Sequence, residues 1–213
     1  MTKNTTILLA DDHAVVRSGL RRLLELNDHL EVVAEADSGE QAYQKFGELL
    51  PDVLVMDMSM PGMGGLEALR RIVTRYPNAR VVIFSMHENA AFASQALAAG
   101  ARGYVGKSGQ ADDLVVAVKE VAAGRGYLSA QVAQKIALQN LSGDDDPFRL
   151  LSAREFEIFR MLVEGGSVDH IAEQLNISHK TVANYQTMLK QKLGVTSPLE
   201  MVRLAIRHGV INS

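Results

Sequence analysis

Short apolar runs alternate with amphipathic stretches over the first 123 residues. The apolar runs predict strands buried on both faces, because such strands carry few polar side chains. In the stretches between them apolar residues recur every three or four positions, which is typical of helices that pack on a sheet. The predicted strands are residues 7–10, 30–36, 53–56, 80–84 and 104–105. The predicted helices are residues 15–26, 39–49, 66–76, 90–99 and 112–123.

Five strand-then-helix units in sequence favour a parallel sheet with helices on both faces. We therefore expect residues 1–123 to form an α/β domain with a doubly wound, five-stranded parallel sheet. The pattern changes after Ala123. Residues 130–141 predict one further helix, and the polar segment 142–147 predicts an exposed linker. We assign residues 124–147 to a linker that contains this helix.

Residues 148–213 show no strand pattern and predict a small all-α domain. Ser152 and Glu155 have the spacing of a capping box, which starts a helix that extends to Val163. Ser167, Ser178 and Ser197 are N-cap residues that start three further helices. These helices cover residues 168–175, 178–193 and 198–207. Four short helices follow the sheet domain on this prediction.

The composition narrows the class of protein. Hydrophobic residues make up 47% of the 213 residues and charged residues 22%, which is typical of globular proteins. The absence of cysteine excludes disulfides and thiolate metal sites. Because neither a signal peptide nor a bilayer-spanning apolar run is evident, we expect a soluble, cytoplasmic protein without membrane contact. The net charge is −3, and residues 151–213 hold seven basic against six acidic residues, so DNA binding would depend on a local patch.

Polar residues follow four of the predicted strands: Asp11 and Asp12, Asp57, Ser85 and Lys107. The carboxyl ends of parallel strands meet at one edge of the sheet, where α/β proteins bind ligands. Clustered carboxylates repel one another unless a cation neutralises them, and such oxygen ligands suit Mg²⁺. A carboxylate beside such a cation can attack a phosphoryl group and form an aspartyl-phosphate. The cation and a nearby lysine then stabilise the transferring oxygens.

Each of these residues alone has an ordinary structural explanation. An aspartate at a strand end is usually a cap or turn residue, and an isolated lysine is usually solvated. Ser85 alone indicates nothing. The joint placement at four strand ends is what favours a functional site over these explanations.

The sequence stretches at these strand ends resemble the receiver domains of bacterial two-component response regulators. The matching stretches are Leu-Ala-Asp-Asp-His at 9–13, Asp-Met-Ser-Met-Pro-Gly at 57–62, Phe-Ser at 84–85 and Gly-Tyr-Val-Gly-Lys at 103–107. The resemblance implies a flavodoxin-like fold and a histidine kinase as phosphoryl source. It also implies that the domain catalyses its own Mg²⁺-dependent phosphorylation and dephosphorylation.

The resemblance assigns roles to individual residues. Asp57 is the phospho-acceptor and a metal ligand. Asp12 ligates Mg²⁺ directly and Asp11 through water, and the backbone carbonyl of Ser59 completes the set. Lys107 contacts the phosphoryl oxygens. The switch hydroxyl and the switch aromatic are Ser85 and Tyr104.

Three positions near the site need separate comment. Many receivers have proline after the lysine, often with a cis peptide, whereas this chain has Ser108. A cis bond before serine costs about 3 kcal/mol, so we expect a different loop arrangement. Mg²⁺ prefers oxygen, so His13 is better explained as a helix-start residue than as a ligand. His87 has no role that the sequence assigns.

Residues 167–175 and 178–193 have the pattern of a helix-turn-helix, whose second helix enters the major groove. In that helix Val182, Leu189 and Leu193 share one apolar stripe. The opposite face carries base-reading and phosphate-seeking candidates, namely Lys180, Ala183, Asn184, Thr187 and Lys190. A solvated polar face on a plain helical bundle is the alternative, and charge alone favours it.

Residues 151–209 are similar to LuxR-type helix-turn-helix domains. The matching stretches are Leu-Ser-x-Arg-Glu at 151–155, Glu-Gly at 164–165, Ile-Ala-x-x-Leu at 171–175, Ile-Ser-x-Lys-Thr-Val at 177–182 and Lys-Leu-Gly-Val at 192–195. Together with the receiver pattern, they resemble the NarL/FixJ subfamily of response regulators. The resemblance adds Thr181 and Tyr185 to the DNA-binding set and implies double-stranded DNA as a partner.

Family members often have lysine and histidine where this chain has Ala183 and Tyr185. Ala183 offers only apolar contact, such as to a thymine methyl, and Asn184 is a candidate adenine reader. Tyr185 either reaches phosphate or packs inward. The resemblance also implies a homodimer in the active state. The last helix supplies either the dimer face or ordinary core through Met201, Val202, Ala205 and Ile206, and both alternatives stay open.

The function predicted from these patterns is a DNA-binding transcription regulator that a histidine kinase controls by phosphorylating Asp57. It is not a small-molecule enzyme on this hypothesis. One alternative is a metal-dependent phosphotransferase, but dehalogenase-type hydrolases have an aspartate where this chain has Ser59. A second alternative is a binding module without phosphorylation control, which the full acidic set disfavours.

Overall fold

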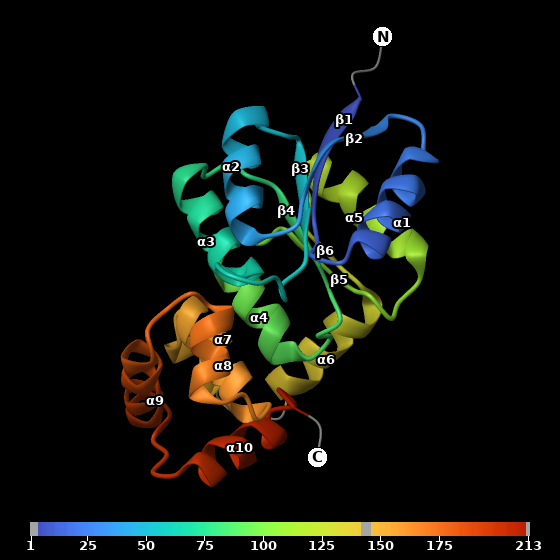
Figure 1. Ribbon diagram of the computed structural model, residues 1–213. Helices are drawn as coiled ribbons and strands as arrows, with labels where there is room; N and C mark the ends of the chain where they lie inside the picture. Colours follow the sequence, from blue (N-terminus) through green and yellow to red (C-terminus); the bar gives the residue numbers. More distant parts are fainter. Residues whose placement is uncertain (1–3, 142–145, 212–213) are drawn as a thin grey trace.

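The computed structural model of the protein describes residues 4–141 and 146–211. Figure 1 shows a parallel sheet with helices on both faces and a smaller group of helices below it. The strand order is β2-β1-β3-β4-β5-β6, so the direction of strand addition reverses between β1 and β3. The strands are β1 (Thr5–Ala10), β2 (Leu30–Ala36), β3 (Val53–Met56), β4 (Val81–Ser85), β5 (Gly103–Gly106) and β6 (Tyr127–Leu128).

Two apolar clusters sandwich this sheet. Leu24 and Leu114 belong to the cluster under α1 and α5, and Phe46 and Leu69 belong to the cluster under α2, α3 and α4. The doubly wound arrangement predicted from the sequence is therefore confirmed. The helices are α1 (Ala14–Glu25), α2 (Gly39–Leu49), α3 (Gly65–Arg75), α4 (Ala90–Ala98) and α5 (Ala111–Ala122).

The prediction of five strands is wrong, because the structure has a sixth. Tyr127 and Leu128 pair in parallel with Gly103 and Tyr104 at the open edge of β5. A strand of two half-buried residues has no periodicity that a sequence can reveal. The strand is formed by tertiary contact with β5. We call residues 4–128 the sheet domain.

The segment predicted as a linker has more structure than expected. The helix predicted at 130–141 is confirmed as α6 (Ala130–Leu141), which lies along α4. Residues 142–145 of the predicted exposed stretch lie outside the described residues. Asp146 is buried, contrary to the prediction, and its Oδ1 accepts a hydrogen bond from the Phe148 N–H. That bond caps a short 3-10 helix, η1 (Pro147–Leu150).

The four C-terminal helices predicted from the sequence are confirmed. They are α7 (Ala153–Val163), α8 (Val168–Gln174), α9 (His179–Leu193) and α10 (Pro198–Arg207). Ser152 and Glu155 form the expected capping box. Ser167, Ser178 and Ser197 each accept the expected N-cap hydrogen bond, which satisfies amide groups that have no partner within the helix. We call residues 147–211 the helical domain.

The two domains share one continuous apolar cluster. Phe92 of α4 meets Phe156 of α7 edge-on, with ring centroids 5.0 Å apart. Phe148 of η1 lies 5.8 Å from Phe156, and the Gln95 side chain of α4 donates to its carbonyl. Figure 1 shows α7 beside α4 accordingly. No helix within residues 4–141 and 146–211 combines the length and apolar character that a bilayer span requires.

Candidate functional site

Three of the predicted strand-end residues meet in a buried ionic contact. The Lys107 ammonium donates to Asp11 Oδ2 at 2.7 Å and to Asp57 Oδ2 at 2.8 Å. Asp11 and Asp57 are 2% and 4% exposed. Burial lowers the pKa of Lys107, but its hydrogen bonds to Asp11 and Asp57 outweigh that effect, and the net pKa is raised. The ammonium therefore stays charged and holds the two carboxylates together.

Asp12 and His13 form the outer side of this site. The His13 N–H donates to Asp11 Oδ1 at 2.8 Å, and its Nδ1 lies 2.9 Å from Asp12 Oδ1. Ligand atoms of Asp11, Asp12, His13 and Asp57 all lie within 4.8 Å of one another. The Asp12 side chain is 29% exposed and that of His13 66% exposed. Solvent thus reaches the site from the side of β1.

The donor set of this site fits Mg²⁺. Asp57 Oδ1 is buried and has no hydrogen-bond partner within the described part of the chain. Such an atom is costly unless a ligand satisfies it. Three aspartates against one lysine leave two negative charges, which one divalent cation would balance. Carboxylate oxygens are the ligands that Mg²⁺ prefers, so the structure supports the predicted metal site.

The start of α3 packs directly against the backbone of Asp57. A Cβ built on Gly65 would lie 2.0 Å from the Asp57 carbonyl oxygen, so only glycine fits there. The preceding Gly64 has φ 73°, a left-handed conformation that favours glycine. The loop after β3 is therefore held close to the acidic site by two glycines in sequence.

The predicted switch residues are both completely buried. Ser85 ends β4, and its Oγ accepts a hydrogen bond from the His87 N–H at 3.1 Å. The Tyr104 hydroxyl donates to the His87 carbonyl and lies 3.5 Å from Met58 Sδ. Burial raises the pKa of Tyr104, so its hydroxyl stays protonated and donates. Ser85 and Tyr104 therefore both bind the backbone of His87.

His87 links the acidic site to α4, a role that sequence reasoning missed. Its Nε2 is hydrogen-bonded to Ser59 Oγ at 3.1 Å. Its ring stacks on Phe92 with centroids 4.2 Å apart and planes 4° apart. Burial, followed by the charge of Arg160, lowers the pKa of His87, so the ring is neutral at pH 7. Residues five and 28 positions away make these contacts, and no sequence motif connects them.

The loop after Lys107 has a trans peptide bond before Ser108, as the cost of a cis bond there predicts. The described residues contain no cis peptide bond, so the bond between Lys107 and Ser108 is trans. Both the N–H and the hydroxyl of Ser108 donate to the Glu88 carboxylate. Glu88 also lies 3.6 Å from the Lys135 ammonium of α6. These contacts fix the loop to the segment after β4.

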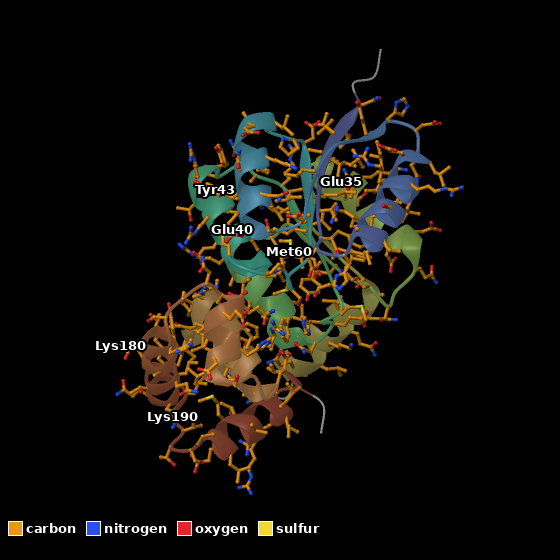
Figure 2. The ribbon with its side chains drawn as sticks, viewed as in Figure 1. Glu35, Glu40, Tyr43, Met60, Lys180 and Lys190 are labelled. Carbon is orange, nitrogen blue, oxygen red and sulfur yellow. The ribbon has the colours of Figure 1, made fainter. Side chains whose placement is uncertain are left out.

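The predicted DNA-reading face of α9 is open to solvent. Lys180, Ala183, Asn184 and Thr187 are exposed and Lys190 is partly exposed. Figure 2 shows Lys180 and Lys190 on the side of α9 that faces away from the sheet domain. The opposite stripe packs inward as predicted, with Val182 and Leu189 fully buried and Leu193 partly buried against the same apolar cluster.

Thr181 and Tyr185 have additional contacts within the protein. The Thr181 hydroxyl is hydrogen-bonded to Ser178 Oγ at 2.8 Å as part of the helix cap. Tyr185 is half-buried and packs against the apolar cluster. It also lines a cavity of about 560 Å³ between the domains. Of the two alternatives for Tyr185, the structure supports inward packing.

The four residues offered for a dimer face divide between two environments. Met201 and Ala205 are 4% and 0% exposed, so they belong to the domain core and not to a dimer face. Val202 is half-buried, and Ile206 is 39% exposed. Met201 and Ala205 are four residues apart, so the helical period turns both towards the core. The exposed candidates for a dimer contact are therefore Val202 and Ile206.

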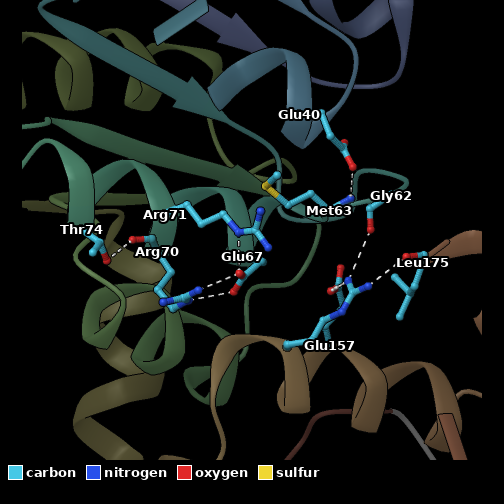
Figure 3. Close-up of polar contacts among 10 residues, drawn as sticks. Glu40, Gly62, Met63, Glu67, Arg70, Arg71, Thr74, Glu157 and Leu175 are labelled. Carbon is cyan, nitrogen blue, oxygen red and sulfur yellow. Dashed lines mark hydrogen bonds and ion pairs between the residues drawn. The ribbon is translucent and has the colours of Figure 1, made fainter. Parts of the chain in front are cut away.

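Polar contacts join the loop after β3 to the helical domain, as Figure 3 shows. The Arg154 guanidinium donates to the carbonyl of Gly62 at 3.3 Å, to Glu157 at 2.8 Å and to the carbonyl of Leu175 at 3.0 Å. The Gly62 N–H donates to the Gln174 carbonyl at 3.0 Å. Sequence reasoning missed this interface, because domain docking leaves no periodic pattern.

Two family models match the chain. One is the response regulator receiver domain, over residues 7–119, and the other is the luxR family of bacterial regulatory proteins, over residues 149–205. The first covers the acidic site and the second covers α7, α8, α9 and most of α10.

Whole-length relatives agree with these matches. The chain is 41% identical to the response regulator GacA of Pseudomonas viridiflava, over 97% of this chain and 98% of that protein. It is 39% identical to the response regulator UvrY of Escherichia coli K12, over 97% and 96%. Among solved structures it is similar to RcsB of Salmonella enterica serovar Typhimurium bound to promoter P1flhDC with the phosphomimetic BeF3−. That similarity has a TM-score of 0.71 and 29% identity, over 95% of this chain and 98% of the other.

Proposed function

The chain belongs to the NarL/FixJ-type two-component response regulators, which join a receiver domain to a LuxR-type DNA-binding domain, and we propose that Asp57 is its regulatory phosphorylation site. The family makes it a phosphorylation-regulated transcription regulator and not a small-molecule enzyme. We divide it into a receiver domain (1–123), a linker (124–147) whose Tyr127 and Leu128 add strand β6 to the sheet, and a DNA-binding domain (148–213). The receiver match at 7–119 lies within residues 1–123, and the luxR-family match at 149–205 lies within residues 148–213.

The observation that carries the proposal is the buried Asp57 carboxylate. One oxygen pairs with Lys107 at 2.8 Å, and the other has no partner within the described residues. A buried oxygen with a free lone pair beside a cationic group is prepared to act as a nucleophile. Ser85 ends β4, the strand beside β3, and its hydroxyl can then contact the product.

The proposed reaction is an in-line phosphoryl transfer. Asp57 Oδ1 attacks the phosphorus of a phosphohistidine on a sensor kinase, the P–N bond breaks, and its electron pair stays on the histidine nitrogen, which takes a proton. Asp12, Asp57 and the Ser59 carbonyl would hold Mg²⁺ directly, and Asp11 through water. When bound, Mg²⁺ supplies positive charge that stabilises the transferring oxygens. Lys107 then moves its hydrogen bond from Asp57 to a phosphoryl oxygen.

The DNA-binding role is assigned to α9. Its exposed face presents Lys180 and Lys190 to phosphates and Asn184 to base edges. Thr187 and Ala183 lie on the same face. We propose that the active form is a cytoplasmic homodimer on double-stranded DNA, with Val202 and Ile206 in the contact. Support for DNA binding comes from the similarity to promoter-bound RcsB.

The phosphorylation site is tested by intact mass after incubation with Mg²⁺ and acetyl phosphate. The expected result is a single phosphoryl adduct that requires Mg²⁺ and is absent from Asp57→Ala. Asp52→Ala serves as the matched control, because Asp52 lies at the opposite end of β3. An adduct on Asp57→Ala, or none on folded wild-type protein, would contradict the proposal.

A further inference from the structure

The segment after β4 lies between the acidic site and the helical domain, and His87 is its central residue. The His87 backbone is bound at both ends by the predicted switch residues. Its N–H donates to Ser85 Oγ at 3.1 Å, and its carbonyl accepts from the Tyr104 hydroxyl. Any movement of Ser85 or Tyr104 therefore acts directly on the position of His87.

The His87 side chain extends this contact in two directions. Towards the acidic site, its Nε2 bonds Ser59 Oγ at 3.1 Å, two residues after Asp57. Towards α4, its ring lies flat on Phe92 at 4.2 Å. One side chain thus touches both the loop that follows Asp57 and the helix that carries the docked domain.

The contact continues into the helical domain through aromatic rings. Phe92 is 2% exposed and meets Phe156 of α7 edge-on at 5.0 Å. Phe156 is 1% exposed and contacts Phe148, so neighbouring side chains enclose it. Tightly packed interiors transmit small displacements because they move between discrete arrangements.

We propose that His87 is the positioning residue that couples the phosphorylation state of Asp57 to the docking of the DNA-binding domain. The inference rests on the proposed function of Asp57. A phosphoryl group on Asp57 draws the Ser85 hydroxyl towards its oxygens, and Ser85 then releases the His87 N–H. His87 shifts, its ring leaves the face of Phe92, and the contact of Phe92 with Phe156 weakens.

A second route for the signal exists and has to be separated from this one. The loop after β3 contacts the helical domain directly through Gly62, which bonds Gln174 and Arg154. That loop also follows Asp57 in the chain. Coupling through this loop alone would not depend on the His87 ring.

The test measures the affinity of the full chain for a DNA duplex that the wild-type protein enriches from a random-sequence pool, before and after phosphorylation by acetyl phosphate and Mg²⁺. The variants are His87→Ala, which removes the ring, and His87→Phe, which keeps a flat ring on Phe92 but loses the bond to Ser59. Met86→Ala is the control for the same segment, since Met86 is 70% exposed. Intact mass reports the phosphoryl adduct in each sample, and thermal unfolding reports folding.

Couplings of this kind are typically roughly 5- to 150-fold in affinity. His87→Ala is expected to reduce the gain in DNA affinity on phosphorylation to about twofold or less. His87→Phe and Met86→Ala are expected to keep most of the wild-type gain. All variants are expected to form the adduct.

Each other outcome overturns a defined part of the account. If phosphorylation raises the DNA affinity of His87→Ala as much as that of the wild type, the inference is overturned. The proposed function would still stand, with the Gly62 loop as the route. If His87→Ala and His87→Phe lose the same share of this gain in DNA affinity, the stacking of the His87 ring on Phe92 is not what couples the two domains. No adduct or no DNA response in the wild type would overturn the proposed function and the inference together.

Discussion

The carboxylate of Glu157 in α7 lies directly against Gly64 at the start of α3. A Cβ built on Gly64 would come within 1.8 Å of Glu157 Oε1, so a side chain here would displace the Glu157 carboxylate. Glu157 is 8% exposed, and burial raises its pKa to about 7 despite the opposing charge and hydrogen bond of Arg154. The unphosphorylated chain thus keeps an acidic side chain in the interface between its domains.

Gly64→Ala is expected to open this interface. The methyl group would occupy the space of the Glu157 carboxylate, and a left-handed alanine also costs about 1 kcal/mol of stability. Gly124→Ala is the matched control, because Gly124 also has a positive φ but no atom within 4 Å of a built Cβ. The chain has no cysteine, so Gln44→Cys and Gln191→Cys can carry a fluorescent pair across α2 and α9. Energy transfer should fall in Gly64→Ala only; equal values in both variants would contradict the docked arrangement.

Docking is expected to weaken as the pH rises from about 4.5 to about 7. The docked pKa of Glu157 lies above its ordinary value of 4.5, so the docked state holds a proton that the undocked state releases between pH 4.5 and 7. Arg154 and Arg160 lower this pKa and Glu67 raises it, and Glu67 is itself held ionised by Arg70 and Arg71. The docking constant should fall by up to about tenfold per pH unit in this window and stay level above it.

The same fluorescent pair measures this pH response. Glu157→Gln removes the titrating group while keeping the shape of the side chain, and it should show docking that does not change between pH 5 and 8. Persistence of the wild-type pH response in Glu157→Gln would assign the response to another group.

Lys107→Met is expected to destabilise the receiver domain in the absence of Mg²⁺. The substitution leaves the buried carboxylates of Asp11 and Asp57 without their shared cation, and breaking a buried ion pair costs about 3 kcal/mol or more. Added Mg²⁺ should recover part of the loss, because it binds the folded state. Lys119→Met, on the exposed surface of α5, should change the melting temperature little. If Lys119→Met lowers the melting temperature as much as Lys107→Met does, this explanation is refuted.

Two substitutions on α9 should weaken DNA binding in different ways. Lys180→Ala removes a phosphate contact, so it should weaken binding to all DNA sequences alike. It should also reduce the salt dependence of the binding constant by about one counterion. Asn184→Ala should make the binding free energy for the selected duplex less favourable by about 1–3 kcal/mol and change that for random DNA little. Fluorescence anisotropy at several salt concentrations separates the two effects. A sequence-selective loss in Lys180→Ala would reverse these assignments.

The acidic site could be predicted because it follows from topology. Parallel strands bring their carboxyl ends to one edge, so the positions of Asp11, Asp57 and Lys107 in the chain already imply that they meet. The N-caps of the helical domain are equally local, since Ser152 and Glu155 are three residues apart. Periodicity and capping spacing are properties of residues close together in the sequence. The strand order of a parallel sheet then brings the strand ends together.

The contacts between the domains could not be predicted in this way. Glu157 carries a charge, and such side chains usually stay exposed, yet it is buried where Gly64 of the sheet domain approaches it. His87 acquires its role from Ser59 and Phe92, which lie in other elements. The edge strand β6 exists because β5 offers unpaired backbone groups. Each of these depends on which surfaces meet, and a single sequence does not encode that in its pattern.

The most direct test of the account measures the DNA affinity of the full chain before and after phosphorylation, beside Asp57→Ala treated in the same way. The selected duplex, acetyl phosphate and Mg²⁺ are the only additions. The account predicts that the wild type binds more tightly in proportion to the phosphoryl adduct it carries, and that Asp57→Ala stays at the unphosphorylated value. An adduct that forms on Asp57 without any change in DNA affinity, or a gain of affinity that survives in Asp57→Ala, would contradict it.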